Sequence, residues 1–450
     1  MISPARWAAF EALRRADPVR GGGKDLASAL SDARGLVSDP RDRALATEIA
    51  LGVERWRAAL DATIAAAAGR SIDAVDFPAL LALRIAVFQL AHLTRTPAHA
   101  VVDDAVEMTR RAGAARAAGF VNAVLRRLLR GPLDAGLPPR PEDDDERAWV
   151  RYLSTTLSHP AWLVERWMAR HGARAAEQWA IFNNAPAPLT VRVNTRRIAV
   201  ERAQADMAAE GVDTEPAAHA PGALVAASGN PMSTSLYRDG LVALMDETSQ
   251  LVGVLAASCL SGTVLDACAS PGGKTLVLAC DMAEGSRVIA ADRRPRRVAL
   301  LRRSLARYGL TGLPVVQHDL ARGVPFEHLD GILVDAPCSG LGTIRRDPDI
   351  RWRRSETDLA PLAAMQRTLL HEAAAAVKPG GRVVYATCSS EPEENEQVVD
   401  AFLAVHGGFA RTAIAGAPFA AFIDARGDFR TLPHRDGLEA FYAAVLTRTL

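Results

Sequence analysis

The sequence predicts a doubly wound, mostly parallel α/β domain at residues 241–450, preceded by a small α+β module at 150–240 and an all-helical domain at 1–135. Three observations support this organisation. Helical periodicity runs through the first 130 residues, a stretch rich in Pro, Gly and acids interrupts it at 131–146, and strand and helix patterns alternate after residue 240. Such alternation is typical of parallel sheets covered by helices.

Residues 1–135 repeat apolar side chains at helical spacing. Trp7, Phe10 and Leu13 share one face of a first helix. Later helices are expected at 79–93, 101–111 and 117–130. The last of these ends in a cluster of three arginines, Arg126, Arg127 and Arg130. Cations there suit the negative end of a helix dipole, which is the interpretation favoured here; contact with phosphates is the alternative.

The later regions show mixed patterns. In the module, helices are predicted at 161–181 and 200–210, with an alternating strand at 189–194. In the α/β domain, strands are expected at 263–266, 287–292, 313–317, 331–335 and 381–386, and helices at 274–282 and 295–308. Strands separated by helices need crossover connections, which favours parallel pairing.

Composition limits the possible functions. The formal net charge is +1, so a nucleic-acid partner would have to contact local basic patches. The five cysteines form no CxxC pair and have no histidine cluster, so we expect free thiols and no metal. The first twenty residues lack the apolar core of a secretory signal, and the apolar run 62–68 is too short to cross a bilayer. We therefore expect a soluble, cytoplasmic protein.

Loops that follow the predicted parallel strands carry four acids and two cysteines. They are Asp266, Asp292, Asp319, Asp335, Cys338 and Cys388. Because the carboxyl ends of parallel strands meet at one edge of a sheet, a ligand site is expected there. A single acid in such a loop often only caps the next helix, whereas four at successive strand ends favour a functional site.

The loop after the first of these strands is rich in glycine. Its run from Gly272 to Thr275 resembles a phosphate-binding loop, but Cys268 stands where that loop needs a glycine, and the dinucleotide pattern GxGxxG is absent. Asp292 follows the next strand, where a carboxylate accepts hydrogen bonds from ribose hydroxyls. A nucleoside without phosphates therefore fits best, and S-adenosylmethionine is the common one.

Cys338 and Cys388 lie where a substrate would enter, whereas Cys259 and Cys280 fall in apolar helical stretches. Thiols in that place suit methylation of cytosine at C5. A thiolate that adds to C6 turns the ring into an enamine, whose C5 can attack a sulfonium methyl. An acid such as Asp335 would assist at N3, and a second thiol could assist release. The residues alone do not rank the two thiols.

Several motifs strengthen this interpretation. They lie at Val264–Thr275 (VLDACASPGGKT), Leu333–Gly342 (LVDAPCSGLG), Tyr385–Ser389 (YATCS) and Pro392–Asn395 (PEEN), with further matches at 246–250 and 344–352. Together they resemble the Nol/Nop/Sun family of RNA cytosine-5 methyltransferases. The resemblance implies that the α/β domain is a Rossmann-like, S-adenosylmethionine-dependent methyltransferase domain.

The same resemblance implies individual roles. Cys388 would be the nucleophile, and Cys338 would assist product release. Asp292 would bind ribose, Asp319 would lie near the adenine, and Asp335 would lie between cofactor and target base. The match is weakest at Asp319, whose following residues differ from the family's common Gly-Arg. The backbone that would hold the cofactor belongs to Cys268, Ala269, Ser270, Pro271, Gly272, Gly273 and Lys274.

The helical region adds a second likeness. Residues 118–127 (AGFVNAVLRR) look like the last helix of NusB, an RNA-binding transcription factor. A NusB-like domain ahead of such a catalytic domain is similar to bacterial methyltransferases of 16S ribosomal RNA. That RNA is therefore the expected substrate, with no DNA or membrane partner, and the chain is expected to be a monomer. A transfer RNA substrate, and an antitermination factor that only binds RNA, are the alternatives.

Two groups of residues are candidates for RNA contact. Arginine next to an aromatic ring can contact phosphates and stack on a base. The first group follows the Cys338 loop: Arg345, Arg346, Arg351, Trp352, Arg353 and Arg354. A solvated loop is the alternative, because Asp347 and Asp349 offset part of the charge. In the middle module, Arg192 and Asn194 are the corresponding candidates.

Overall fold

The computed structural model describes residues 2–94 and 96–449, and the chain divides into two units. Unit 1 comprises the residues up to Pro186 together with Ile344–Glu356, and unit 2 comprises Ala187–Thr343 and the residues from Thr357 onward. The short second segment of unit 1 therefore interrupts the chain of unit 2. Across the described ranges, no helix combines the length and the apolar character that a membrane span requires.

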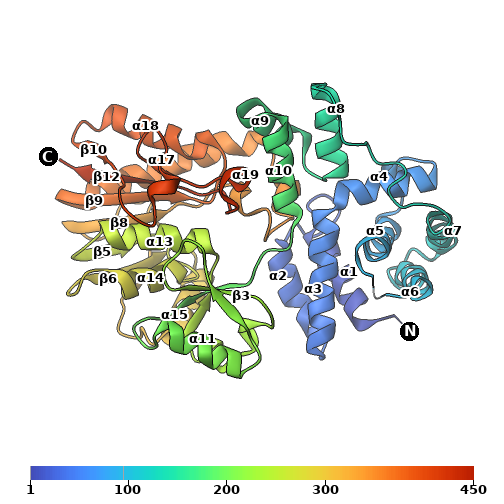
Figure 1. Ribbon diagram of the computed structural model, residues 1–450, viewed down its shortest axis with the longest axis horizontal. Helices are drawn as coiled ribbons and strands as arrows, with labels where there is room; N and C mark the ends of the chain where they lie inside the picture. Colours follow the sequence, from blue (N-terminus) through green and yellow to red (C-terminus); the bar gives the residue numbers. More distant parts are fainter. Residues whose placement is uncertain (1, 95, 450) are drawn as a thin grey trace. The chain divides into compact units, whose positions relative to one another are not determined.

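Unit 1 is helical, as the sequence predicts (Figure 1). Its helices are α1 (Pro4–Ala16), α2 (Leu26–Ala33), α3 (Pro40–Arg55), α4 (Arg57–Ala68), α5 (Phe77–His92), α6 (Ala98–Arg111), α7 (Ala118–Leu128), α8 (Glu146–Arg151), α9 (Ala161–His171), α10 (Ala173–Asn184) and α16 (Ile350–Arg353). Helix α5 contacts α1, α3, α4, α6 and α7. Its sequence is apolar on almost every side, which is typical of a helix at the centre of a bundle.

Helices α8, α9 and α10 belong to unit 1, although 150–240 was expected to form one module. Arg140, in the expected linker, forms a two-point ion pair with Glu177 of α10, with N–O distances of 2.6 and 2.7 Å. Ser158 Oγ accepts a hydrogen bond from the N–H of Ala58 in α4. These contacts tie α8, α9 and α10 to the preceding helices, and the rest of the segment, from Ala187 onward, belongs to unit 2.

A four-stranded antiparallel sheet begins unit 2, in the order β2-β3-β1-β4. Its strands are β1 (Thr190–Val193), β2 (Thr214–Pro216), β3 (Ala223–Ala226) and β4 (Val242–Leu244), with helices α11 (Val200–Ala209) and α12 (Ser235–Arg238). Alternating apolar residues of β1 pack against α11 in a small core, which explains the strand and helix patterns in this part of the sequence.

The larger sheet of unit 2 has the order β10-β12-β9-β8-β5-β6-β7, with β11 paired to β12. Its strands are β5 (Thr263–Asp266), β6 (Arg287–Asp292), β7 (Val315–Gln317), β8 (Leu329–Asp335), β9 (Val377–Thr387), β10 (Phe409–Thr412), β11 (Phe429–Arg430) and β12 (Tyr442–Arg448). The strands from β9 to β7 in this order are parallel, and β12 is antiparallel to β9. The predicted doubly wound, mostly parallel sheet is confirmed.

Helices cover both faces of this sheet. They are α13 (Glu247–Cys259), α14 (Gly273–Asp281), α15 (Pro295–Arg307), α17 (Leu359–Ala376), α18 (Glu396–Val405) and α19 (Pro433–Asp436). Leu333 and Val384 share a core with α13, whereas Ile332 and Val383 share a core with α17 and α18. Successive strand residues thus point to opposite layers, and the sheet is buried on both sides.

Candidate active site

The site lies at the carboxyl edge of the parallel strands. Asp266 ends β5, Asp292 ends β6 and Asp335 ends β8, and Cys388 directly follows β9. Strands β5 and β8 are neighbours although β6 and β7 lie between them in the chain. This edge is therefore the switch point of the sheet, where ligands of doubly wound folds bind.

Cys338 and Cys388 face each other. Their Sγ atoms are 3.3 Å apart, and both residues are partly exposed. The loops that carry them are joined by backbone hydrogen bonds from Ala336 N to Ala386 O and from Gly342 N to Cys388 O. The hydrogen bond with Cys388, together with burial, raises the pKa of Cys338 well above its usual value. Cys338 therefore stays a thiol at neutral pH and can donate towards Cys388.

Lys274 and Asp335 form an ion pair beside the thiols, with 2.7 Å between Nζ and Oδ2. Burial lowers the pKa of Lys274, but the charge and the hydrogen bond of Asp335, together with further negative neighbours, outweigh it and the pKa is raised. Lys274 thus keeps its positive charge at neutral pH, and that charge also interacts with Cys388. The sequence predicted only a cofactor-loop position for Lys274 and missed this pairing.

Asp266 is fully buried, with no exposed surface. Thr275 Oγ1 donates to its Oδ2 at 2.6 Å, whereas Oδ1 has no hydrogen-bond partner among the described residues. Burial raises the pKa of Asp266 to about 7. A buried oxygen without a donor is costly, so a ligand that supplies an N–H or O–H group there would be favoured.

The glycine-rich loop presents its backbone to the same edge. Gly272 has φ = 108°, a conformation that side chains disfavour, and an added Cβ would lie 3.1 Å from the Leu301 side chain. Ala269 and Ser270 are buried, whereas Pro271 is exposed. The Cys268 thiol has a raised pKa, first because of burial and then because of the charges of Asp335, Asp266 and Asp292. These three acids therefore lie around the loop.

Asp292 has several partners within the protein. Its carboxylate accepts hydrogen bonds from Ser270 N at 3.4 Å and from Arg294 N at 3.2 Å, and Arg297 Nε lies 3.1 Å away. The contact with Arg294, which precedes α15, is the helix-capping arrangement weighed against ribose binding. Asp319 is more exposed, and its nearest cation is Arg293 at 3.9 Å. Ribose and adenine contacts at these two acids stay predictions.

Glu394 connects the two thiol loops, although the sequence identified it only as part of a motif. It is fully buried and accepts hydrogen bonds from Ser339, which follows Cys338, and from Ser389, which follows Cys388. Nothing in the sequence separates this glutamate from its acidic neighbours, because only the fold shows which of them contacts both thiol loops. Gln366 of α17 also donates to it, at 2.9 Å.

The predicted RNA contact of Arg351 is wrong. Arg351 is fully buried in unit 1, where it donates to Ser158 O at 2.8 Å and to Asn184 Oδ1 at 2.9 Å. Trp352 Nε1 donates to Glu54 O at 2.7 Å. Carbonyl oxygens at helix ends need donors, and these two side chains supply them. Both side chains hold unit 1 together, but only Arg351 lacks exposed surface; Trp352 is partly exposed, and its RNA contact stays a prediction.

The two candidates in the middle module are also buried. Arg192 forms an ion pair with Asp281 of α14. Asn194 Nδ2 donates to Gly240 O at 3.1 Å and to Tyr308 O at 2.8 Å. Both side chains join the small sheet to the large one, so their prediction as RNA contacts is wrong.

The rest of the arginine-rich segment is mixed. Arg345 lies over the Phe182 ring at 4.4 Å and donates to Pro186 O at 2.7 Å, which is again a contact within unit 1. Arg353 is exposed and pairs with Asp349 at 3.4 Å. RNA contact at Arg346, Arg353 and Arg354 stays a prediction.

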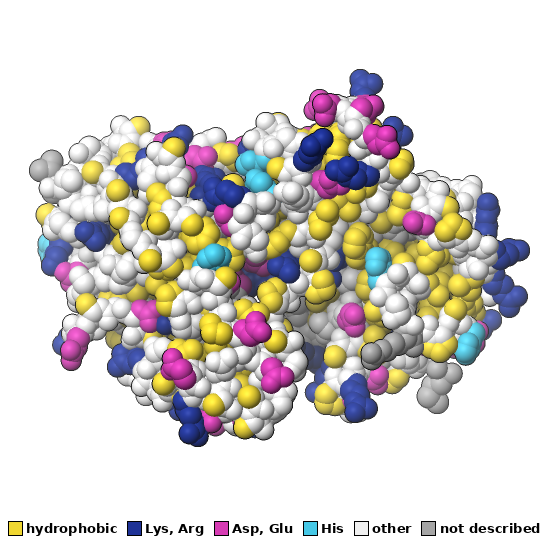
Figure 2. All heavy atoms as spheres, in the orientation of Figure 1, with side chains coloured by type: hydrophobic (Ala, Val, Ile, Leu, Met, Phe, Trp, Pro, Cys, Tyr) yellow, Lys and Arg dark blue, Asp and Glu magenta, His cyan; other side chains and the backbone are white. Residues whose placement is uncertain are grey.

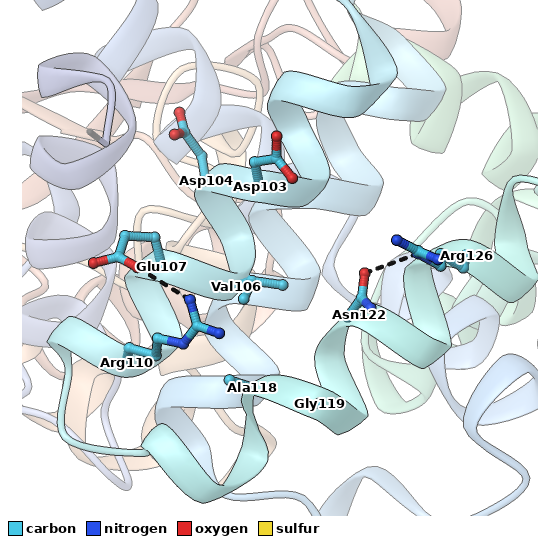
Figure 3. A pocket seen from close by; sticks show the side chains of 9 residues that line it. All are labelled: Asp103, Asp104, Val106, Glu107, Arg110, Ala118, Gly119, Asn122 and Arg126. Carbon is cyan, nitrogen blue, oxygen red and sulfur yellow. Dashed lines mark hydrogen bonds and ion pairs between the residues drawn. The ribbon is translucent and has the colours of Figure 1, made fainter.

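A separate basic surface lies on α6 and α7 of unit 1. Figure 2 shows Lys and Arg side chains gathered along the edge that α7 forms. Its exposed arginines are Arg110, Arg111, Arg116, Arg126, Arg127 and Arg130. Arg126 Nε donates to Asn122 at 3.1 Å beside a hollow of about 480 Å³ between the two helices (Figure 3). Exposed arginines of this kind are able to contact phosphates.

Comparison with known proteins covers almost the whole chain. The family model for 16S rRNA methyltransferase RsmB/F matches residues 257–447, the NusB family matches 3–130, and the RsmF/B-like ferredoxin-like domain matches 159–233. The probable ribosomal RNA small subunit methyltransferase B of Bacillus subtilis (strain 168) is 34% identical over 412 residues, which cover 89% of this chain and 90% of that protein.

Two further comparisons agree with these matches. Ribosomal RNA small subunit methyltransferase B of Vibrio cholerae is 33% identical, covering 95% of this chain and 94% of that protein. The crystal structure of PH0851 matches with a TM-score of 0.81 and 25% identity, covering 100% of this chain and 99% of that one. These findings confirm the resemblance that the motifs and the NusB-like helix indicated. The chain belongs to the RsmB/F family of 16S rRNA methyltransferases.

Proposed function

We propose that this protein transfers a methyl group from S-adenosylmethionine to C5 of a cytosine in 16S ribosomal RNA, in the cytoplasm. The observation that carries the proposal is the pair of thiols, 3.3 Å apart, beside the Lys274–Asp335 ion pair at the switch point of the sheet. Methyl transfer to an exocyclic amine needs no thiol, whereas addition at C6 of a pyrimidine needs one.

The residues of the site fit the cofactor. The backbone from Cys268 to Lys274 would hold it, with Asp292 towards its ribose and Asp319 towards its adenine. The unpartnered, buried Oδ1 of Asp266 calls for a donor, and a cationic, amine-bearing nucleoside brings one. When bound, S-adenosylmethionine supplies an electrophilic methyl group.

Cys388 acts as the nucleophile in this proposal. Its thiolate forms a bond from Sγ to C6 of the cytosine, and the electrons of the C5–C6 double bond become available at C5. Asp335 would assist at N3. After methylation, a base such as a water molecule takes the C5 proton, the electrons of that C–H bond restore the C5–C6 double bond, and the C6–Sγ bond breaks with its electron pair on sulfur to return the thiolate. Cys338, held as a thiol next to Cys388, takes part in that release.

RNA is the proposed partner of the exposed arginines on α6 and α7. Phosphate contacts of this kind position an RNA without reading its sequence, and they weaken as salt increases. The target base itself has to leave its stack to reach Cys388. A loop or a partly unfolded region of 16S RNA is therefore the proposed target, and the protein is proposed to act as a monomer.

The proposal is tested with radiolabelled methyl transfer to unmethylated 16S RNA. Transfer is expected with the wild-type protein, and Cys338→Ala is expected to accumulate a covalent protein–RNA adduct because release is slowed. Cys259→Ala, which alters a cysteine outside the site, serves as the matched control. Tight RNA binding without any methyl transfer would contradict the proposed enzymatic activity. Bisulfite sequencing that finds the methylated cytosine in transfer RNA would contradict 16S RNA as the substrate.

A further inference from the structure

Glu394 is a buried carboxylate whose partners all belong to the walls of the thiol site. It lies in a short turn, Pro392–Glu394, between β9 and α18, with no exposed surface. One oxygen accepts from Ser339 N at 2.8 Å and from Gln366 Nε2 at 2.9 Å, and the other accepts from the hydroxyls of Ser339 and Ser389. Its desolvation is offset by these four donors.

These donors flank both cysteines. Ser339 directly follows Cys338 and Ser389 directly follows Cys388, and their hydroxyl oxygens are 3.2 Å apart. Gln366 also donates to the carbonyl of Pro337, the residue before Cys338, at 3.0 Å. The Cys338 loop is thus anchored on both sides of its thiol, and the Cys388 loop is tied to the same carboxylate.

We propose that Glu394 is a positioning residue that sets the separation of the two thiols, so that Cys338 can act when the product leaves Cys388. This inference rests on the proposed function. The charge of Glu394 also contributes to the raised pKa of Cys338, after the hydrogen bond with Cys388 and burial. The same carboxylate therefore holds Cys338 in place and keeps it protonated.

Two substitutions separate the effect of the length of the Glu394 side chain from the effect of its negative charge. Glu394→Asp keeps the charge but shortens the side chain, so it cannot hold both loops at once. We expect kcat to fall by about 100-fold, the loss that a displacement of about 1 Å can cause, with KM for RNA and for the cofactor changed less than about twofold. The covalent RNA adduct should accumulate, as it does for Cys338→Ala.

Glu394→Gln keeps the reach, because its amide can donate to the two hydroxyls while its oxygen still accepts from the two N–H groups. We expect kcat within about tenfold of the wild type and a pH profile shifted to lower pH, because the pKa of Cys338 falls without the negative charge. Glu393→Gln removes the same charge one residue away and is the matched control.

A second readout does not depend on activity. Diamide takes two hydrogen atoms from a pair of thiols, which leaves one disulfide bond and the reduced reagent, and the rate reports how often the two Sγ atoms meet. Mass spectrometry of the Cys338–Cys388 peptide should show disulfide formation in the wild type and about tenfold slower formation in Glu394→Asp, on the scale of the same loss of alignment. Ser339→Ala removes only the hydroxyl hydrogen bond from Ser339 to Glu394, so it should slow disulfide formation less.

Wild-type kcat and wild-type disulfide formation in Glu394→Asp would overturn the inference. A wild-type disulfide rate with equal losses of kcat, cofactor affinity and stability would also overturn it, since Glu394 would then only support the fold. If Glu394→Asp does not fold, Ser339→Ala takes its place: slower disulfide formation supports the inference, and a wild-type rate overturns it. Failure of the wild-type protein to methylate cytosine, with a Glu394-dependent disulfide rate, would reject the proposed function and retain the positioning role.

Discussion

Each unit of the molecule contains a fully buried charge that is satisfied mainly by neutral groups. In unit 2, Glu394 accepts hydrogen bonds from two serines and a glutamine. In unit 1, Arg351 donates to the carbonyl oxygens of Arg55 and Ser158 and to Asn184, and burial lowers its pKa. The two centres have opposite charge and the same degree of burial.

The neighbours of these two centres differ, and the neighbours determine the role. The partners of Glu394 adjoin two reactive thiols, so a small displacement changes the chemistry. The partners of Arg351 are carbonyl groups of helices and loops, so its loss changes only how firmly the helices are held. A buried charge alone therefore does not indicate catalysis, because its role depends on the groups that it positions.

The largest expected effect concerns Cys388, one of the two thiols that Glu394 is proposed to position. Cys388→Ala should reduce methyl transfer by at least about 10⁴-fold, because no bond to C6 can form. Stability should stay close to that of the wild type, since the residue is partly exposed. Radiolabel transfer and urea unfolding measure the two quantities. Substantial residual transfer would reject Cys388 as the nucleophile.

Arg351→Ala should have the opposite effects, a large loss of stability with little change in methyl transfer. Loss of the guanidinium leaves several buried carbonyl oxygens without donors and opens a cavity, so unfolding should become easier by about 4 kcal/mol. Methyl transfer per folded molecule should stay within about twofold. Arg353→Ala, at an exposed position nearby, is the control for urea unfolding. Weaker RNA binding without loss of stability would restore the RNA-contact interpretation of Arg351.

Asp266 offers a third kind of buried charge, one that changes its protonation near neutral pH. Its pKa is raised to about 7 in the folded protein and is about 3.9 in an unfolded chain, so the folded state holds the proton more tightly. Stability from this group is present at low pH and is lost as the pH rises towards 7. Between pH 5 and pH 8 the loss should be about 3 kcal/mol.

Asp266→Asn should remove that dependence. Urea unfolding at several pH values, without cofactor, compares the slopes of the variant and the wild type. Asp319→Asn is the control, because Asp319 is partly exposed. Identical slopes for Asp266→Asn and the wild type would show that Asp266 is already ionised at pH 5.

The smallest expected effect concerns the exposed cations at the end of α7. Arg127→Ala combined with Arg130→Ala should weaken RNA binding by only a few fold, and the slope of log affinity against log salt should fall by about 1 for each phosphate that the variant no longer binds. Filter binding at several salt concentrations measures this. An unchanged slope would assign these arginines to the helix dipole, the interpretation that the sequence favours.

Much of the fold followed from local patterns in the sequence. The parallel strands and their helices were predicted because buried strands read as short apolar runs, and Asp266, Cys338 and Cys388 were identified because chemistry gathers at strand ends. The burial of Arg351, which was expected to contact RNA, and of Glu394, which was noted only as part of a motif, could not be predicted, for one reason. Both stand among charged neighbours that look solvated, and their burial depends on residues distant in the chain.

The short segment Ile344–Glu356 has a consequence for how this chain can be truncated. A polypeptide that stops at Pro186 would contain every helix of unit 1 except α16, yet it would lack the buried Arg351 and the Trp352 indole that donates to Glu54 O. Such a truncation would leave carbonyl groups of unit 1 without their donors. We therefore expect unit 1 to fold stably only when the segment that lies within the sequence of unit 2 is supplied with it.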